Sequence, residues 1–404
     1  MTEGVSSKIL KIYGSESILA GVIMIVIFDK KTLLESLTPA MYTVSGKNTM
    51  PAIEGVHLVC TEDDVCKLET FDLEKGIKTS FKCTVIEEGN CVINAQKLLQ
   101  IVKVMPDGEI KMTVDRSYKT VIESGLSHFD IKALPGEDFP SIPEIIGEKG
   151  FVIPQYLFRK MVNKIYFAIG QNDARPVFNG AYFQITDNKM TLVSCDSNRL
   201  AYCEREVELE NRNRDGSGLN LKFIVPGKTL AEVLKMVKDT EDEMEIRITR
   251  RYMVFTIGDF TVFSKTIDSD YINYERILPK EHRIVTFLKA EELRSALERS
   301  SLIVEDRLAG SIRSFVKFTI DEKLSISTNS ANGNVYDEID IKKDDEGSIV
   351  IGFNCKFLLD AIRVCDDGEI KMSYNNPLTG VLIEPQSTEE GKFKYFVMPI
   401  RMNN

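Results

Sequence analysis

The hexapeptide DGEIKM occurs twice in this chain, at Asp107–Met112 and again at Asp367–Met372. The two copies lie 260 residues apart, which is too far for a solenoid and indicates two long, similar units. Each copy follows an amphipathic segment, NAQKLLQIVKVM from Asn94 and NCKFLLDAIRVC from Asn354. A short helix followed by a strand is therefore predicted at two distant places in the chain.

A third copy of this helix lies between the other two. PGKTLAEVLKMV begins at Pro226, 132 residues after the first copy begins and 128 before the last. The fifth and ninth residues of all three segments are aliphatic, which places them on one helix face at i and i+4. The tenth residue is basic in every copy, at Lys103, Lys235 and Arg363. The sequence therefore predicts three copies of one unit.

Each unit also has an earlier helix-like segment: KKTLLESL from Lys30, QYLFRKMV from Gln155 and EELRSALE from Glu291. Between the helices run alternating or β-branched segments such as GAYFQIT, KMTLVSC, YMVFTIG and FVKFTID, which are typical of strands. The fold class predicted is α+β, with three similar tandem domains, each of two helices packed on mostly antiparallel sheets.

Turn-rich stretches mark the borders between the units. LPGEDFPSIPEIIGEKG separates the first from the second, and ILPKEHR separates the second from the third. We expect domains at residues 24–148, 149–280 and 281–404. Residues 1–23 are interpreted as an extension outside the fold, because MIVIFDKKTLLESL from Met24 would make a natural start.

One apolar stretch, ILAGVIMIVIF at residues 18–28, could be mistaken for a membrane segment. It is eleven residues long, whereas a spanning helix needs about 20. Its β-branched residues favour a buried strand, and no small-residue cleavage site follows it. We therefore expect no membrane association.

The residues that could carry chemistry form no recognisable site. No phosphate-binding glycine loop is present, and the three histidines occur in no catalytic or metal-binding pattern. The acidic clusters at residues 62–64 and 366–367 could hold a metal, but their glycine and loop context favours solvated turns. The eight cysteines lack metal-ligand spacing and are expected to be reduced and mostly buried. We expect no enzyme activity, cofactor or metal.

The net charge of −10 argues at first against a nucleic-acid partner. The six predicted helices, however, contain fifteen basic and seven acidic residues, a net charge of +8. This separation is expected if the helices line one surface that faces phosphates. The alternative is that Lys and Arg are simply good surface residues for helices. With no base-reading motif present, contact with the DNA backbone is the interaction predicted.

Several stretches resemble the bacterial DNA polymerase III β sliding clamp family. They are NTMPAIEGV (Asn48–Val56), LPGEDFPSIP (Leu134–Pro143), NDARPVFNG (Asn172–Gly180), CDSNRLA (Cys195–Ala201), RILPK (Arg276–Lys280) and YFVMPIRM (Tyr395–Met402). Together with the threefold repeat, they extend from Met24 to Met402 in the order that the family has.

This resemblance implies a homodimer that closes head to tail into a ring around double-stranded DNA. Such a ring tethers the replicative polymerase α subunit for processive synthesis and is opened by a separate clamp loader. Other polymerases and repair proteins are expected to bind through short QLxLF-like motifs. The location implied is cytoplasmic, associated with the nucleoid.

The resemblance and the helix pattern also predict two sets of site residues. The DNA-facing set is Lys47, Lys103, Arg175, Lys228, Lys235, Lys356 and Arg363. The partner-peptide pocket is expected to contain Arg175, Phe178, Cys195, Ser197, Asn198, Arg199, Leu200, Pro279, Leu378, Gly380, Val397, Met398, Pro399, Ile400 and Arg401. In that pocket, apolar side chains would hold Leu and Phe anchors, and Arg199 and Arg401 would fix the peptide's polarity.

The sequence departs from the family pattern at three positions, where Lys47 replaces a frequent Arg and Pro176 and Val177 replace aromatic residues. Contact with DNA is expected to be weaker there.

Two other classes of function stay open at this point. A repeat scaffold for protein partners would show no salt-dependent binding to DNA, and an enzyme at a domain interface would need a residue set that the sequence does not reveal. VMPI could also be only a last core strand.

Overall fold

The computed structural model describes residues 21–44, 46, 50–143, 145–304, 315–331, 333–344, 346–366, 368–386 and 391–402. Expectations for residues 1–20, Lys47 and the last two residues lie outside this part of the chain. By its contacts the chain divides into two compact units. One is made of residues 1–147, 232–236 and 244–265, and the other of residues 148–231, 237–243 and 266–404.

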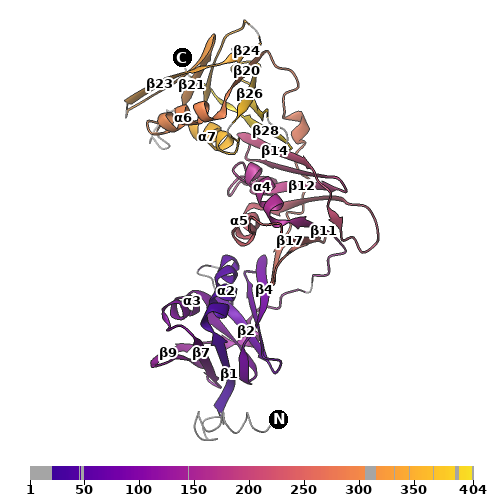
Figure 1. Ribbon diagram of the computed structural model, residues 1–404, viewed down its shortest axis with the longest axis vertical. Helices are drawn as coiled ribbons and strands as arrows, with labels where there is room; N and C mark the ends of the chain where they lie inside the picture. Colours follow the sequence, from indigo (N-terminus) through magenta and orange to yellow (C-terminus); the bar gives the residue numbers. More distant parts are fainter. Residues whose placement is uncertain are drawn as a thin grey trace. The chain divides into compact units, whose positions relative to one another are not determined.

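All six predicted helices are present, two in each third of the chain (Figure 1). They are α2 (Lys30–Ala40), α3 (Ala95–Val104), α4 (Gln155–Tyr166), α5 (Gly227–Met236), α6 (Ala290–Ser301) and α7 (Cys355–Arg363). Each helix follows a strand, directly or, for α7, after one residue, and a further strand comes after the second helix of each pair. The repeated unit is therefore strand–helix, several strands, then strand–helix–strand.

One backbone hydrogen bond recurs in all three repeats. The first helix of each pair donates an N–H near its start to a carbonyl just before the strand that follows the second helix. The bonds are Lys30 N to Gly108 O at 2.9 Å, Gln155 N to Asp242 O at 2.8 Å, and Ala290 N to Gly368 O at 2.9 Å. Because the first N–H groups of a helix lack partners within it, this bond ties the two helices' ends together.

The first domain begins with strand β1, so residues 22–28 of the apolar stretch form a largely buried strand, as predicted. Its other elements are listed here. They are β1 (Val22–Asp29), η2 (Met41–Thr43), η3 (Pro51–Glu54), β2 (Gly55–Thr61), β3 (Val65–Phe71), β4 (Lys75–Lys82), β5 (Thr84–Glu87), β6 (Gly89–Asn94), β7 (Glu109–Asp115), β8 (Lys119–Ser124), β9 (Ser127–Lys132), β10 (Leu134–Pro135) and η4 (Gly136–Asp138). The strand starts at Val22, slightly before the domain start expected at Met24.

Two sheets enclose the core of the first domain. One has the order β5-β1-β7-β8-β9, and the other contains the run β10-β6-β2-β3-β4, which continues through β19 and β18. Both sheets and both helices contribute to one buried cluster, for example Val26 from β1, Leu58 from β2, Leu37 from α2 and Leu98 from α3. The apolar helix face predicted from the i, i+4 spacing is therefore the face that packs on the sheets.

The second domain supplies strands to both compact units. Its remaining elements are β11 (Lys149–Pro154), η5 (Pro176–Asn179), β12 (Gly180–Thr186), β13 (Lys189–Cys195), β14 (Arg199–Glu206), β15 (Glu210–Asn211), β16 (Asn220–Pro226), β17 (Glu243–Ile248), β18 (Tyr252–Ile257), β19 (Phe260–Lys265) and η6 (Tyr274–Arg276). In the first unit β19 pairs antiparallel with β4 of the first domain, so the sheet is shared by the two domains.

The third domain joins the second through a nine-stranded sheet of order β16-β12-β13-β14-β28-β27-β26-β20-β24. Its other sheet has the order β23-β22-β21-β25-β29. The strands are β20 (Ile284–Lys289), β21 (Val316–Ile320), β22 (Lys323–Ser330), β23 (Gly333–Asp340), β24 (Lys342–Lys343), β25 (Ile349–Phe353), β26 (Glu369–Tyr374), β27 (Val381–Pro385), β28 (Lys392–Val397) and β29 (Pro399–Ile400). The junction is the antiparallel pair β14 and β28, with Leu200 opposite Phe396.

Cys83 is half-buried and the other seven cysteines are buried, which confirms the prediction of mostly buried cysteines; their reduced state stays a prediction. Within the described ranges, no helix is both long and apolar enough to cross a membrane.

Candidate functional site

The turn between β13 and β14 is the centre of the predicted pocket, and one carboxylate organises it. Asp196 Oδ1 accepts hydrogen bonds from the backbone N–H groups of Asn198 and Arg199, both at 3.1 Å. The Asp196 N–H donates to the Arg199 carbonyl at 3.2 Å, and Ser197 takes a positive φ of 75°. Because the Asp196 side chain accepts these backbone N–H groups, the segment is an Asx-type turn.

Beside this turn, four adjacent strands place apolar side chains in one row across the sheet. Cys195 of β13 lies opposite Leu200 of β14, Leu200 opposite Phe396 of β28, and Phe396 opposite Leu382 of β27. With Phe178 and Val193 they form one buried cluster. The row therefore crosses from the second domain to the third. A pocket formed by both domains, as predicted, would need such a row.

Three of the predicted pocket residues, Phe178, Cys195 and Leu200, lie in this cluster, and burial raises the pKa of the Cys195 thiol to about 11. Val397, also a predicted pocket residue, does not lie in this cluster. It lies opposite Arg199 in the next row of the sheet. Because successive residues of a strand point to opposite faces, its side chain points away from the cluster. Phe396, which the sequence reasoning omitted, belongs to the cluster in its place.

The sequence reasoning also missed an aromatic group that packs against this cluster. Tyr182 and Tyr271 stack with ring centroids 5.1 Å apart, and Tyr274 contacts both Tyr182 and Tyr202. Tyr271 donates its hydroxyl to the Val193 carbonyl at 3.3 Å, and burial raises the pKa of Tyr274 to about 12. Aromatic residues scattered over the sequence gave no signal, because only the sheet register and the linker before β20 bring them together.

Met398 lies where the chain passes from one sheet to the other. β28 ends at Val397 in the nine-stranded sheet, and β29 begins at Pro399 in the five-stranded sheet. The Met398 N–H donates to the Asn198 carbonyl at 2.8 Å, and its side chain is 40% exposed. An exposed methionine beside the fixed turn is an adaptable apolar contact. VMPI is thus not a continuous core strand.

The remaining pocket residues differ in their surroundings. Leu378 is 68% exposed in a turn that Asn376 organises, where the Leu378 N–H donates to Asn376 Oδ1 at 2.8 Å. Gly380 is buried, and a Cβ atom there would lie 2.6 Å from the Phe396 ring, so glycine allows that ring its place. Pro279, Pro399 and Ile400 are half-buried, and Arg401 is exposed.

Arg175 lies over the apolar cluster and is held there. Its guanidinium is 4.1 Å from the centroid of the Phe178 ring and pairs with Asp173, Nε to Oδ1 at 3.1 Å. A further hydrogen bond runs to Ser197 Oγ. The hydrogen bond from Arg175 lowers the pKa of the Asp173 carboxyl. These contacts place Arg175 at the rim of the pocket.

Arg199 is placed differently from our expectation. Its side chain is 10% exposed and lies on the helix-covered face of the sheet, opposite to Leu200. Nε donates to Asp196 at 2.8 Å and Nη1 to Asp360 of α7 at 2.7 Å. Because its side chain is only 10% exposed, the guanidinium offers little accessible surface for a peptide to bind directly.

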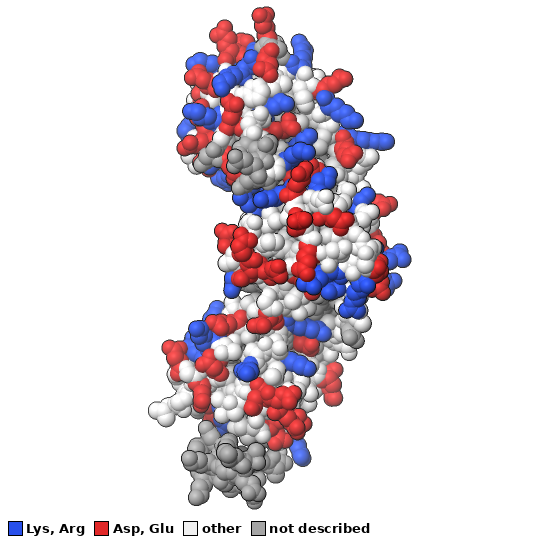
Figure 2. Space-filling view, turned by 45° about the vertical axis from the view of Figure 1, so that its right-hand side comes forward, with Lys and Arg blue, Asp and Glu red and all other residues white. Residues whose placement is uncertain are grey.

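The described members of the DNA-facing set are all exposed, but their partners differ. Lys103 at the end of α3, Lys228 at the start of α5 and Lys356 of α7 make no ion pair with a described residue. Lys235 bonds Glu232 at 2.8 Å and lies 4.7 Å over the Tyr42 ring, and Arg363 pairs with Glu298 at 3.3 Å. On the face drawn in Figure 2, acidic and basic side chains are intermingled. Lys103, Lys228 and Lys356 are therefore the ones free to meet phosphates.

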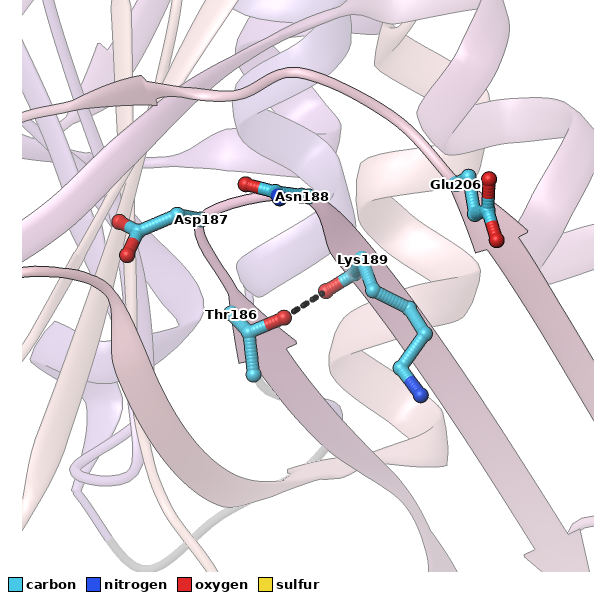
Figure 3. A pocket seen from close by; sticks show the side chains of 5 residues that line it. All are labelled: Thr186, Asp187, Asn188, Lys189 and Glu206. Atoms are coloured by element: carbon cyan, nitrogen blue, oxygen red, sulfur yellow. Dashed lines mark hydrogen bonds between the residues drawn. The ribbon is translucent and has the colours of Figure 1, made fainter.

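A separate polar pocket of about 480 Å³ opens at the turn between β12 and β13 (Figure 3). It is lined by Thr186, Asp187, Asn188, Lys189 and Glu206, and Thr186 Oγ1 donates to the Lys189 carbonyl at 3.3 Å. Lys189 begins β13 and Val193, a member of the apolar cluster, lies four residues further along the strand, so this pocket is about 13 Å from the cluster. Among the residues that the structure describes, no group of His, Cys, Asp or Glu is arranged to hold a metal.

Comparison with known proteins gives the same division into three. Family models of the DNA polymerase III beta subunit match along the chain: the N-terminal domain at residues 24–143, the central domain at 152–273 and the C-terminal domain at 275–401. The beta sliding clamp of Bacillus subtilis is 25% identical over 384 residues, which are 92% of this chain and 98% of that protein.

Solved structures agree with the sequence matches. A crystal structure of a DNA polymerase III beta subunit from Eubacterium rectale superposes with a TM-score of 0.85 at 29% identity, covering 94% of this chain and all of that one. A sliding clamp from Pseudomonas aeruginosa, bound to griselimycin, has a TM-score of 0.83 at 25% identity and covers 95% of this chain and all of that one. Three tandem clamp domains thus define the fold, and the chain belongs to the DNA polymerase III beta subunit family, the family of the beta sliding clamp.

Proposed function

We propose that this chain is a sliding clamp, an accessory subunit without catalysis of its own that encircles duplex DNA and tethers the replicative polymerase for processive synthesis. The observation that carries the proposal is the match to all three domains of one clamp family over residues 24–401, together with the threefold repeat. We propose 24–148, 149–280 and 281–404 as the three domains. Its place of action is the cytoplasm, on the nucleoid.

The two ends of the repeat array support closure into a head-to-tail dimer. β9 is an edge strand in the first domain and β23 an edge strand in the third. Each carries an exposed aromatic side chain, Phe129 at 37% and Tyr336 at 64% exposure. Open strand edges are sites for pairing with another chain, and a contact between unlike ends that closes yields a ring. A second copy supplies β23 to β9 and β9 to β23.

The contact with DNA is electrostatic and independent of sequence. Three exposed lysines on the second helices can neutralise phosphates: Lys103, Lys228 and Lys356. They lack the planar guanidinium with which arginine makes paired hydrogen bonds to a base. A separate, ATP-driven clamp loader opens the ring; the sequence of this chain contains no glycine-rich phosphate-binding loop of its own.

Partner proteins bind in the cluster shared by the second and third domains. Leu200, Phe178 and Phe396 supply the apolar floor, and Met398 supplies an adaptable wall. The occupant is a short QLxLF-like peptide carried by the polymerase α subunit, the clamp loader and other polymerases and repair proteins. Two pockets in one ring allow two partners to be held together.

The pocket is tested with the Met398→Glu variant. A carboxylate at this exposed position places an unpaired charge beside the apolar cluster and should abolish binding of a fluorescein-labelled QLALF peptide in a polarisation titration. The dimer should persist in sedimentation, because Met398 lies in neither β9 nor β23. Unchanged peptide affinity in this variant would remove the pocket from the proposal.

A further inference from the structure

The Arg199 guanidinium contacts residues of both domains beside the predicted pocket. Besides its bonds to Asp196 and Asp360, it lies between two rings, 4.5 Å from the centroid of Phe357 and 5.4 Å from that of Phe167. Phe357 and Asp360 belong to α7 of the third domain, and Phe167 follows α4 of the second. One side chain therefore links the β13–β14 turn to the helix of the next domain.

The turn that Arg199 anchors is also the turn that forms the pocket wall. Asp196 uses one oxygen to hold the backbone of Asn198 and Arg199 and the other to hold the Arg199 guanidinium. The carbonyl of Asn198 then accepts the Met398 N–H. A continuous chain of hydrogen bonds thus runs from Asp360 through Arg199 and Asp196 to Asn198 and on to Met398, the two residues that form one wall of the pocket.

We propose that Arg199 is a positioning residue: it does not touch the partner peptide, but with Asp360 it fixes the β13–β14 turn against α7 so that the Asn198–Met398 wall is formed before a peptide arrives. The inference rests on the proposed partner pocket and names the residue pair that keeps this pocket in its binding shape. A wall formed in advance spares the peptide the cost of ordering it, which is the usual source of affinity in a preorganised site.

The physical chemistry of the pair fits this role. Arginine presents a planar fork that bonds two carboxylates and stacks on rings at once, which a lysine at this position would not do. The side chains of Arg199, Asp196 and Asp360 are 10%, 15% and 20% exposed, so solvent screens their interaction only partly. Removing Asp360 would leave the Arg199 guanidinium with one carboxylate partner and free to move toward water. The β13–β14 turn would then move with it.

The test uses Asp360 because it lies outside the pocket. In the full-length protein, Asp360→Ala should weaken binding of the fluorescein-labelled QLALF peptide about tenfold, within the range of couplings between residues in one network. Asp360→Asn keeps an oxygen for the Arg199 N–H groups and should restore affinity to within about threefold of wild type. Hydrogen exchange at the Met398 amide should accelerate in Asp360→Ala without any peptide present.

Lys164→Met is the matched control. It removes another tie between the same two domains, from Lys164 Nζ to Asp366 at 2.9 Å, which does not involve the turn. Peptide affinity should stay within about twofold of wild type although stability falls. Equal losses in Lys164→Met and Asp360→Ala would overturn the proposal, since any loosening of the junction would then suffice.

Two further outcomes separate this inference from the proposed pocket. If Arg199→Ala lowers the affinity for the peptide and Asp360→Ala does not, Arg199 contacts the peptide directly and the positioning role is refuted. If the wild-type protein does not bind the peptide, the proposed pocket is refuted. Hydrogen exchange at the Met398 amide still tests the positioning role in that case. An exchange rate unchanged in Asp360→Ala refutes it.

Discussion

Lys164 provides the sharpest test of how the second and third domains are joined. Its ammonium group, on α4, donates to the Val364 carbonyl at 2.8 Å and to both oxygens of Asp366 at 2.9 and 3.0 Å. It also lies 5.1 Å from the centroid of the Phe393 ring, and its side chain is 9% exposed. Lys164→Met removes the charge and the donors but keeps an apolar stem that packs on the ring.

The cost of this substitution follows from what each partner loses. The Val364 carbonyl, at the end of α7, loses a charge-assisted hydrogen bond, which contributes about 1.5–3 kcal/mol. Asp366 is 66% exposed and regains water, so the loss of this ion pair adds little. We expect a destabilisation of about 2 kcal/mol, which corresponds to a Tm lowered by about 4–8 °C for the unit that contains the junction.

Differential scanning calorimetry measures this shift as a change in the transition of the second and third domains. Lys189→Met is the control, because its ion pair with Glu204 at 3.3 Å involves a lysine that is 44% exposed, and its Tm should fall by less than about 2 °C. A Lys164→Met transition within about 1 °C of wild type would refute the reasoning that Lys164 holds α7 to the second domain.

Two further predictions concern pH and charge. The hydrogen bond with His57 lowers the pKa of Glu69, and a group with a lowered folded-state pKa contributes stability above its unfolded pKa that is lost as pH falls through the folded value. Glu69→Gln should therefore destabilise the first domain at pH 7, and urea titrations should show its difference from wild type disappearing in acid below about pH 4; a difference independent of pH would contradict this. The triple variant Lys103→Glu, Lys228→Glu, Lys356→Glu should load more weakly on every DNA sequence and show a shallower salt dependence, and loading equal to wild type would contradict the proposal that these lysines contact phosphates.

The repeat made much of the fold predictable. The aliphatic fifth and ninth positions located α3, α5 and α7, and the strands EIKMTV, MEIRIT and EIKMSY follow them as β7, β17 and β26. Such elements are specified locally, by periodicity and by the residues that cap the start of a helix. The side chains of Asn94 and Asn354 cap α3 and α7 in this way, because each accepts a hydrogen bond from the backbone N–H three residues later. The resemblance then supplied the ring and the pocket, which no local pattern carries.

The differences between the predicted surroundings of the site residues and the observed ones have the opposite origin. Whether Val397 or Phe396 faces the cluster depends on the register between β14 and β28, and one step along a strand changes the face. The role of Arg199 depends on Asp360, which is 161 residues away in the sequence. The partners of Lys235 and Arg363, Tyr42 and Glu298, are likewise set by packing between helices and strands that the sequence alone does not place.

The central claim, that this chain closes into a ring around DNA, is tested most directly by topology. The protein is loaded with a clamp loader on nicked circular DNA, washed in high salt, and the DNA is then cut once. A closed dimer of about 90 kDa, twice the 45.7 kDa chain, should stay on the circle through the wash, because it is linked and not merely bound, and should leave when the cut provides an end. Protein that the salt removes equally from circular and linear DNA would contradict the account.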